Sequence, residues 1–152
     1  MENKDFKKIV NELFKKFGYQ KNKSYYYKSF EECYLKFDLQ KSNFSNGWYI
    51  NYSILIKELH TDEDVLNTWK QDLSGRVIVE KDNTATDLIE LDIFCDMDEL
   101  KKKIEKGLNE IIVAFEKNEI QSYIEAFPEM LCTATIWAQE YMVKKGYIKE
   151  MK

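Results

Sequence analysis

The sequence predicts an α+β fold, in which an antiparallel β-sheet of about five to six strands carries helices on one face. Three observations support this prediction. Residues 33–40 and 48–54 alternate between apolar and polar side chains, which is the period of half-buried strands. Asn46-Gly47 lies between them and supplies the positive φ angles of a hairpin turn. Apolar residues recur every three or four positions towards both ends of the chain, as in amphipathic helices.

The N-terminal pattern predicts a helix followed by the strands of the sheet. Apolar residues spaced by three and four predict a helix over 5–17, and Gly18 ends it. Residues 19–30 are rich in Tyr and Lys and predict one or two short strands. In the hairpin that follows, we expect the apolar set of the second strand to pack against the helices while the other sheet face stays wet. This set is Trp48, Ile50, Tyr52 and Ile54.

Beyond the first hairpin, the pattern predicts a second hairpin flanked by helices. A capping-box pattern predicts a short helix over 62–69. Renewed alternation over 75–80 and 87–93 predicts the second hairpin. The apolar stripe after Asp96 predicts a capped helix, and a last helix is expected over 130–146.

Composition limits the number of domains and the class of protein. A chain of 152 residues with 44% hydrophobic content suits a single α+β domain over 1–152. No apolar run has the length of a signal peptide core or a membrane span, so we expect a cytoplasmic protein without a membrane partner. Cys33, Cys95 and Cys132 are widely separated and odd in number, which predicts reduced thiols.

Four polar residues are candidates for a ligand-binding site, namely Gln40, Lys41, Asn51 and Arg76. If the second hairpin pairs beside the first, they converge at one sheet edge and offer amide and cationic donors to an anionic or peptide ligand. Arg76 is the only arginine, so bidentate recognition of a carboxylate or phosphate is possible at this position alone. The alternative is structural. Such side chains also satisfy loop backbone, and Arg76 could pair with an acid of its own chain.

An acidic cluster is the candidate partner-binding surface. It comprises Glu90, Asp92, Asp96 and Asp98, next to Glu99. Its charge suits a basic protein partner, such as a nuclease toxin, or a hard cation. The alternative is a wet strand face followed by the acidic first turn of an ordinary helix. No calcium-loop motif accompanies the cluster, and we expect no metal site.

No motif supports an enzyme, a cofactor site or a nucleic-acid surface. His60 is the only histidine, and without a nucleophile motif nearby we expect a solvated loop residue and no catalytic activity. Three scattered Cys and one His lack the spacing of zinc ligands, so neither a metal nor a cofactor is expected. The net charge of −4 argues against a nucleic-acid partner, although Lys and Tyr interleave over 21–28.

Several short motifs occur in a characteristic order. Gly18-Tyr19-Gln20-Lys21 comes first, Leu39-Gln40-Lys41-Ser42 precedes Trp48-Tyr49-Ile50-Asn51, and Gly75-Arg76-Val77 follows. In this order and approximate spacing, the chain resembles the bacterial family catalogued as domain of unknown function 4304. The resemblance implies an α+β fold and no established activity. Members of such families also occur as immunity proteins against bacterial toxins.

The leading hypothesis is a non-enzymatic protein-interaction module, with toxin immunity as one such role. It would use the exposed sheet face and its acidic rim to bind a bacterial toxin or another protein. The alternative is a module that binds a small molecule or a peptide at the polar and cationic sheet edge, and an enzyme ranks third.

Overall fold

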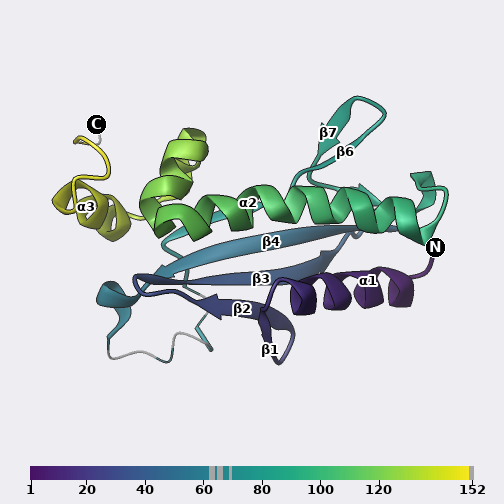
Figure 1. Cartoon of the computed structure of the whole chain (residues 1–152), viewed down its shortest axis with the longest axis horizontal. Coiled ribbons are helices and arrows are strands. Elements are labelled where there is room, and N and C mark those ends of the chain that lie inside the picture. The colour runs from purple at the N-terminus through teal and green to yellow at the C-terminus, as the bar shows by residue number, and fades with distance from the viewer. Residues whose placement is uncertain (62–63, 65–66, 69, 151–152) are drawn as a thin grey trace.

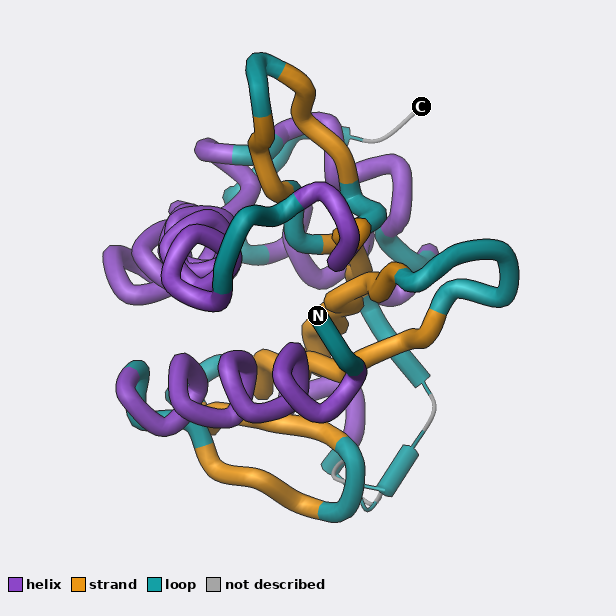
Figure 2. The backbone as a smooth tube through the Cα atoms, turned by 90° about the vertical axis from the view of Figure 1, so that its right-hand side faces the viewer, coloured by secondary structure: helices purple, strands orange, loops and turns teal. Residues whose placement is uncertain are grey.

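The computed structural model describes residues 1–61, 64, 67–68 and 70–150, and it contains a six-stranded antiparallel sheet with two helices on one face (Figures 1 and 2). The predicted fold class is therefore confirmed. The helices on the sheet are α1 (Asn3–Lys16) and α2 (Met97–Ala126). The strands of the sheet are β1 (Gln20–Asn22), β2 (Tyr25–Ser29), β3 (Cys33–Lys41), β4 (Gly47–Ile56), β5 (Leu73–Arg76) and β8 (Ile89–Glu90).

The long β3–β4 hairpin sets the inward face of the sheet. Its register places Phe37 opposite Tyr52 and Leu39 opposite Ile50, so each pair shares one face. The apolar set predicted to pack on the helices is buried, which confirms that prediction. Its exposed fractions are 6% for Trp48, 0% for Ile50, 3% for Tyr52 and 0% for Ile54.

Helix α1 attaches to the sheet through an aromatic cluster. Its Phe14 ring stacks on Tyr26 with the ring centres 4.4 Å apart, and it also contacts Phe37 at 4.9 Å. Gly18, with φ of +82°, follows the helix as predicted, because glycine enters this left-handed region without steric cost. The helix itself begins two residues earlier than predicted, at Asn3.

Tyr19 belongs to this cluster, but its buried hydroxyl finds no hydrogen-bond partner in the described part of the chain. Tyr19→Phe is therefore expected to stabilise the protein by about 1 kcal/mol, because the cost of desolvating an unpaired hydroxyl disappears. Thermal unfolding would show a melting temperature higher by about 2–4 °C. Tyr34→Phe, at a half-exposed position, serves as the control; a lower melting temperature for Tyr19→Phe would contradict this account.

The sheet face away from the helices is only partly open, so the expectation of a wet face holds for one part of it. Lys36 on this face is 9% exposed, and its Nζ donates to the Thr68 carbonyl at 3.2 Å. Burial lowers the pKa of Lys36. Leu55, which also points to this side, is fully buried. The open part of the face is the other end, around Asp38 and Gln40.

The prediction of a single hairpin over 75–80 and 87–93 is wrong in part. Strand β5 ends at Arg76, and the chain then passes beneath α2 before forming a separate two-stranded sheet (Figure 1). The strands of this small sheet are β6 (Val79–Lys81) and β7 (Thr84–Thr86). The returning chain forms β8, whose Ile89 pairs with Trp48 of β4.

The single helix predicted over 130–146 is also wrong. The structure has two elements here, the 3-10 helix η3 (Pro128–Thr133) and helix α3 (Ile136–Lys144). The break occurs because the Thr135 N–H donates to the Asp72 carbonyl at 3.0 Å, while the Thr135 hydroxyl caps α3. Trp137, which lies within the predicted helix, is 69% exposed.

Two further predictions concern the segment after β4. The helix predicted over 62–69 includes residues 62, 63, 65, 66 and 69, which lie outside the described residues. His60 was expected in a solvated loop, and this is wrong. It ends the 3-10 helix η1 (Lys57–His60), and its Nε2 lies 2.8 Å from Oδ2 of buried Asp72. That carboxylate also accepts the Ile56 N–H at 2.7 Å, which fixes Asp72 in the interior. The His60 ring bonds to Asp72 there and is buried with it.

The three cysteines are free thiols in different environments. Cys33 is buried and burial raises the pKa of its thiol, whereas Cys95 and Cys132 are exposed. Thiol titration of the native protein is therefore expected to show two fast-reacting groups, and denaturation should release the third. Three fast thiols in native protein would contradict the burial of Cys33. Fewer than three after denaturation would contradict the expectation of reduced cysteines.

Candidate functional site

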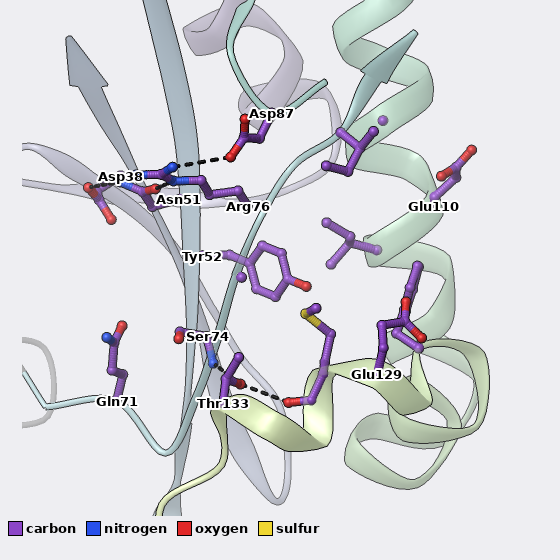
Figure 3. A pocket seen from close by; sticks show the side chains of 16 residues that line it. Asp38, Asn51, Tyr52, Gln71, Ser74, Arg76, Asp87, Glu110, Glu129 and Thr133 are labelled. Carbon is purple, nitrogen blue, oxygen red and sulfur yellow. Dashed lines mark hydrogen bonds and ion pairs between the residues drawn. The ribbon is translucent and has the colours of Figure 1, made fainter. Parts of the chain in front are cut away.

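A cleft of about 610 Å³ lies between strand β5, helix α2 and the 3-10 helix η3 (Figure 3). Tyr52 projects into it from β4, and Ile111 and Met130 add apolar surface from the opposite side. Asp38 and Asn51 line it from the open sheet face and Glu110 from α2, so the cleft joins that face to the helical layer around the edge of β5. No helix in the described part of the chain is long and apolar enough to cross a membrane.

Arg76 organises the open sheet face beside this cleft. Its Nε donates to Asn51 Oδ1 at 3.0 Å, Nη1 to Asp87 Oδ2 at 3.1 Å, and Nη2 to Gln40 Oε1 at 3.3 Å. The guanidinium carbon lies 3.9 Å from the centre of the Tyr49 ring. Hydrogen bonds on three sides and an aromatic ring below hold the guanidinium in one orientation.

The register of the sheet explains why these residues meet. Asn51 of β4 lies opposite both Asp38 of β3 and Arg76 of β5. Its amide nitrogen donates to Gln40 Oε1 at 3.0 Å and to Asp38 Oδ2 at 3.3 Å. We call the connected set the Arg76 surface. It consists of Asp38, Gln40, Tyr49, Asn51, Arg76 and Asp87.

Three of the four predicted ligand-site residues therefore converge, and the fourth does not. Lys41 follows Gln40 in the strand, and neighbouring strand residues point to opposite faces. Its Nζ instead donates to the Ser45 carbonyl at 2.8 Å and lies near the Trp48 ring. The structural alternative for Arg76 also holds, since Asp87 of its own chain neutralises it.

The family described as Domain of unknown function (DUF4304) matches residues 10–118. This chain belongs to that family. The match confirms the resemblance seen in the sequence, and it includes the whole Arg76 surface. No curated protein and no solved structure matches the chain.

Tyr52 lines the floor of the cleft in this DUF4304 chain, and it belongs to a buried pair with Tyr123. The hydroxyls of Tyr52 and Tyr123 lie 2.7 Å apart, and burial raises the pKa of both. Gly75 lies beside the Tyr52 ring, and a Cβ at this glycine would be 2.4 Å from the Tyr52 hydroxyl. A glycine next to Arg76 is therefore a packing requirement of the floor.

Carboxylates dominate the charge around the cleft. Its acidic residues are Asp38, Asp87, Glu110 and Glu129, against the single guanidinium of Arg76. Among the described lining residues there is no lysine, histidine or cysteine. Glu110 and Glu129 were missed in the sequence, because an exposed glutamate on a helix gives no sign of which neighbour it faces.

The predicted acidic cluster lies elsewhere, and its members have separate local roles. Asp92 accepts from the Asn46 amide at 2.9 Å, and Asp96 caps α2 by accepting the Glu99 N–H at 2.8 Å. Glu90 lies in β8, and Asp98 lies in the first turn of α2. None of the four lines the cleft, and the described residues hold no group of acids, His or Cys placed to bind a metal.

A second polar cluster, which the sequence did not indicate, joins the start of β3 to the C-terminal helix. Glu32 Oε2 accepts from the Tyr141 hydroxyl at 2.7 Å and from the Tyr147 hydroxyl at 2.5 Å. Glu119 Oε1 accepts the Glu32 N–H at 2.8 Å. Glu119 lies at a kink in α2 and has φ of +49°. This positive φ is costly outside glycine. The cluster holds the C-terminal segment against the sheet, which gives it a structural role.

Proposed function

We propose that this DUF4304 protein is a non-enzymatic protein-interaction module that binds a basic protein partner. The contact surface is the Arg76 surface together with the acidic rim of the neighbouring cleft. Toxin immunity is the role of this kind that fits best, because a basic nuclease domain has the charge that the rim attracts, and complementary charge accelerates association.

The ordered state of Arg76 is the observation that carries this proposal. Its hydrogen bonds to Asn51, Asp87 and Gln40 use one N–H on each of its three nitrogens, and Asp87 already pairs with its charge, so it attracts a free anion less strongly than an unpaired arginine would. Arg and Tyr that are already fixed lose little conformational entropy when a partner packs on them. Both residue types are enriched in the energetically dominant part of protein interfaces.

A second candidate function is the binding of a peptide or small molecule, and the cleft volume favours it. Its 610 Å³ lies within the size range of ligand pockets, about 300–1,000 Å³. The excess of carboxylates selects against the anionic ligand inferred from the sequence, and favours a cationic one.

Site-specific photocrosslinking tests the interaction proposal. A benzophenone amino acid is placed at Tyr49, within the Arg76 surface, or at Lys8 on the exposed side of α1 as the matched control. In cells that naturally make the protein, position 49 is expected to give one discrete adduct and position 8 none. Equal adducts from both positions, or none from position 49, would rule out this surface as the contact.

The immunity role has a separate test, in which the neighbouring gene is expressed in cells with and without this protein. We expect that gene's product to stop growth, and co-expression of this protein to restore growth.

Arg76→Lys is expected to weaken binding of the crosslinked partner about tenfold, because the charge remains but the planar donors and the stacking on Tyr49 are lost. Isothermal titration calorimetry measures the affinity, and a thermal scan of the same sample reports stability. Unchanged affinity together with a lower melting temperature would mean that Arg76 has a structural role only.

A further inference from the structure

We propose that the cleft binds an extended, lysine- or arginine-bearing segment of the partner, which pairs by strand addition with the outer edge of β5 at Arg76. This inference rests on the proposed function and names the part of the partner that is recognised. It follows from three features, which are the outward backbone groups of Arg76 in β5, the apolar floor and the charge of the rim.

Strand β5 has one outer side, and its Arg76 end is available for pairing because η3 already takes the Ser74 N–H. In the described part of the sheet it pairs with β4 alone, because β8 joins a different stretch of β4. The Val77 N–H donates to the Ile50 carbonyl, and the outward Ser74 N–H donates to the Thr133 hydroxyl at 3.1 Å. Backbone groups alternate along an antiparallel strand, so the N–H and C=O of Arg76 point away from β4 as those of Ser74 do. An extended peptide pairs with such groups by strand addition.

The cleft runs beside this edge and offers a surface for alternate side chains. Figure 3 shows the Tyr52 ring between β5 and the wall that carries Glu110 and Glu129. An extended segment directs successive side chains to opposite sides. Apolar side chains of the segment would contact the floor formed by Tyr52, Ile111 and Met130, while the intervening ones reach the rim.

The charge of the rim selects a basic segment. Four carboxylates line the cleft, and its one guanidinium is already paired with Asp87 at 3.1 Å. Glu110 and Glu129 are exposed, and no ion pair to either occurs among the described residues. An acidic segment would meet an excess of like charge here, whereas lysine or arginine side chains would pair with these two glutamates.

The test uses three fluorescent hexapeptides, measured by anisotropy. One alternates leucine and lysine, the second alternates leucine and glutamate, and the third is the lysine peptide with alternate backbone nitrogens methylated. The lysine peptide is expected to bind and the glutamate peptide to fail. Methylation should weaken binding about tenfold, because the backbone donors that face β5 are lost.

Protein variants locate the site. Glu110→Gln and Glu129→Gln are each expected to weaken the lysine peptide about two- to fivefold, as exposed ion pairs do. Glu140→Gln, an exposed position on α3 outside the cleft, is the matched control and should change nothing.

If the methylated peptide binds as tightly as the unmethylated lysine peptide, strand addition is overturned. If Glu110→Gln and Glu129→Gln bind the lysine peptide as tightly as the unmodified protein does, the cleft is overturned as the site. Complete displacement by lysine amide at the peptide's own concentration would identify a small cation as the occupant and overturn the inference. If no peptide binds while position 49 still crosslinks a partner, this inference fails and the proposed interaction function stands.

Discussion

Replacing Tyr123 by alanine is expected to lower the free energy of unfolding by about 3–5 kcal/mol, the largest effect of any change considered for this protein. Tyr123 is fully buried, and its ring stacks on Phe115 with centres 4.7 Å apart. Its ring also contacts Phe127 at 5.6 Å and meets Tyr52 edge-on. The alanine variant loses these contacts and leaves a cavity beneath the cleft. Denaturant titration measures the effect, and a loss below about 1 kcal/mol would contradict this packing.

The hydroxyl contribution of the same residue can be separated from its ring. Tyr123→Phe leaves the Tyr52 hydroxyl without its partner at 2.7 Å, and about 1–2 kcal/mol of stability should be lost. Tyr52→Phe should cost a similar amount. Removing both hydroxyls should cost little more than removing one, because no unpaired group then remains. Additive losses in this double-mutant cycle would show that the two hydroxyls are not coupled.

Gly107→Ala is expected to destabilise the protein by about 1–3 kcal/mol, although the same change within an exposed helix usually stabilises it by up to about 1 kcal/mol. A Cβ at Gly107 would lie 2.4 Å from the Ile78 carbonyl oxygen and 3.0 Å from a methyl group of Val77. The first of these atoms is backbone, so relief requires α2 or the crossing segment to move. Since that segment leads out of β5, the variant should also widen the cleft and weaken binding of the lysine hexapeptide.

Asn109→Ala provides the control for helix propensity, because Asn109 is exposed on α2 two residues further on. It should be neutral or slightly stabilising. Chemical denaturation of both variants in parallel measures their free energies of unfolding. If Gly107→Ala were as stable as Asn109→Ala, the close approach of α2 to Ile78 would be disproved.

The sequence alone determined the elements whose signals are local. The β3–β4 hairpin, with its buried Ile50 and Ile54, followed from a side-chain period that a slip of one residue would invert. Helix α1 and the cap of α2 at Asp96 followed from spacing and from the first-turn N–H groups that a cap must satisfy. The meeting of Gln40, Asn51 and Arg76 was also predictable, since strands that follow one another tend to pair.

Tertiary structure decided what depends on contacts between distant segments. The Asp72 carbonyl accepts the Thr135 N–H, and this bond divides the last helical segment. No local sequence pattern predicts a bond between residues so far apart in the chain. Gly107 lets the chain pass beneath α2 at Ile78, and this close approach splits the second predicted hairpin. Glu110 and Glu129 acquire their place on the cleft only when α2 and η3 pack beside β5. Long-range packing outweighs local preference at these positions, because a single backbone hydrogen bond or backbone clash exceeds the differences in propensity between residues.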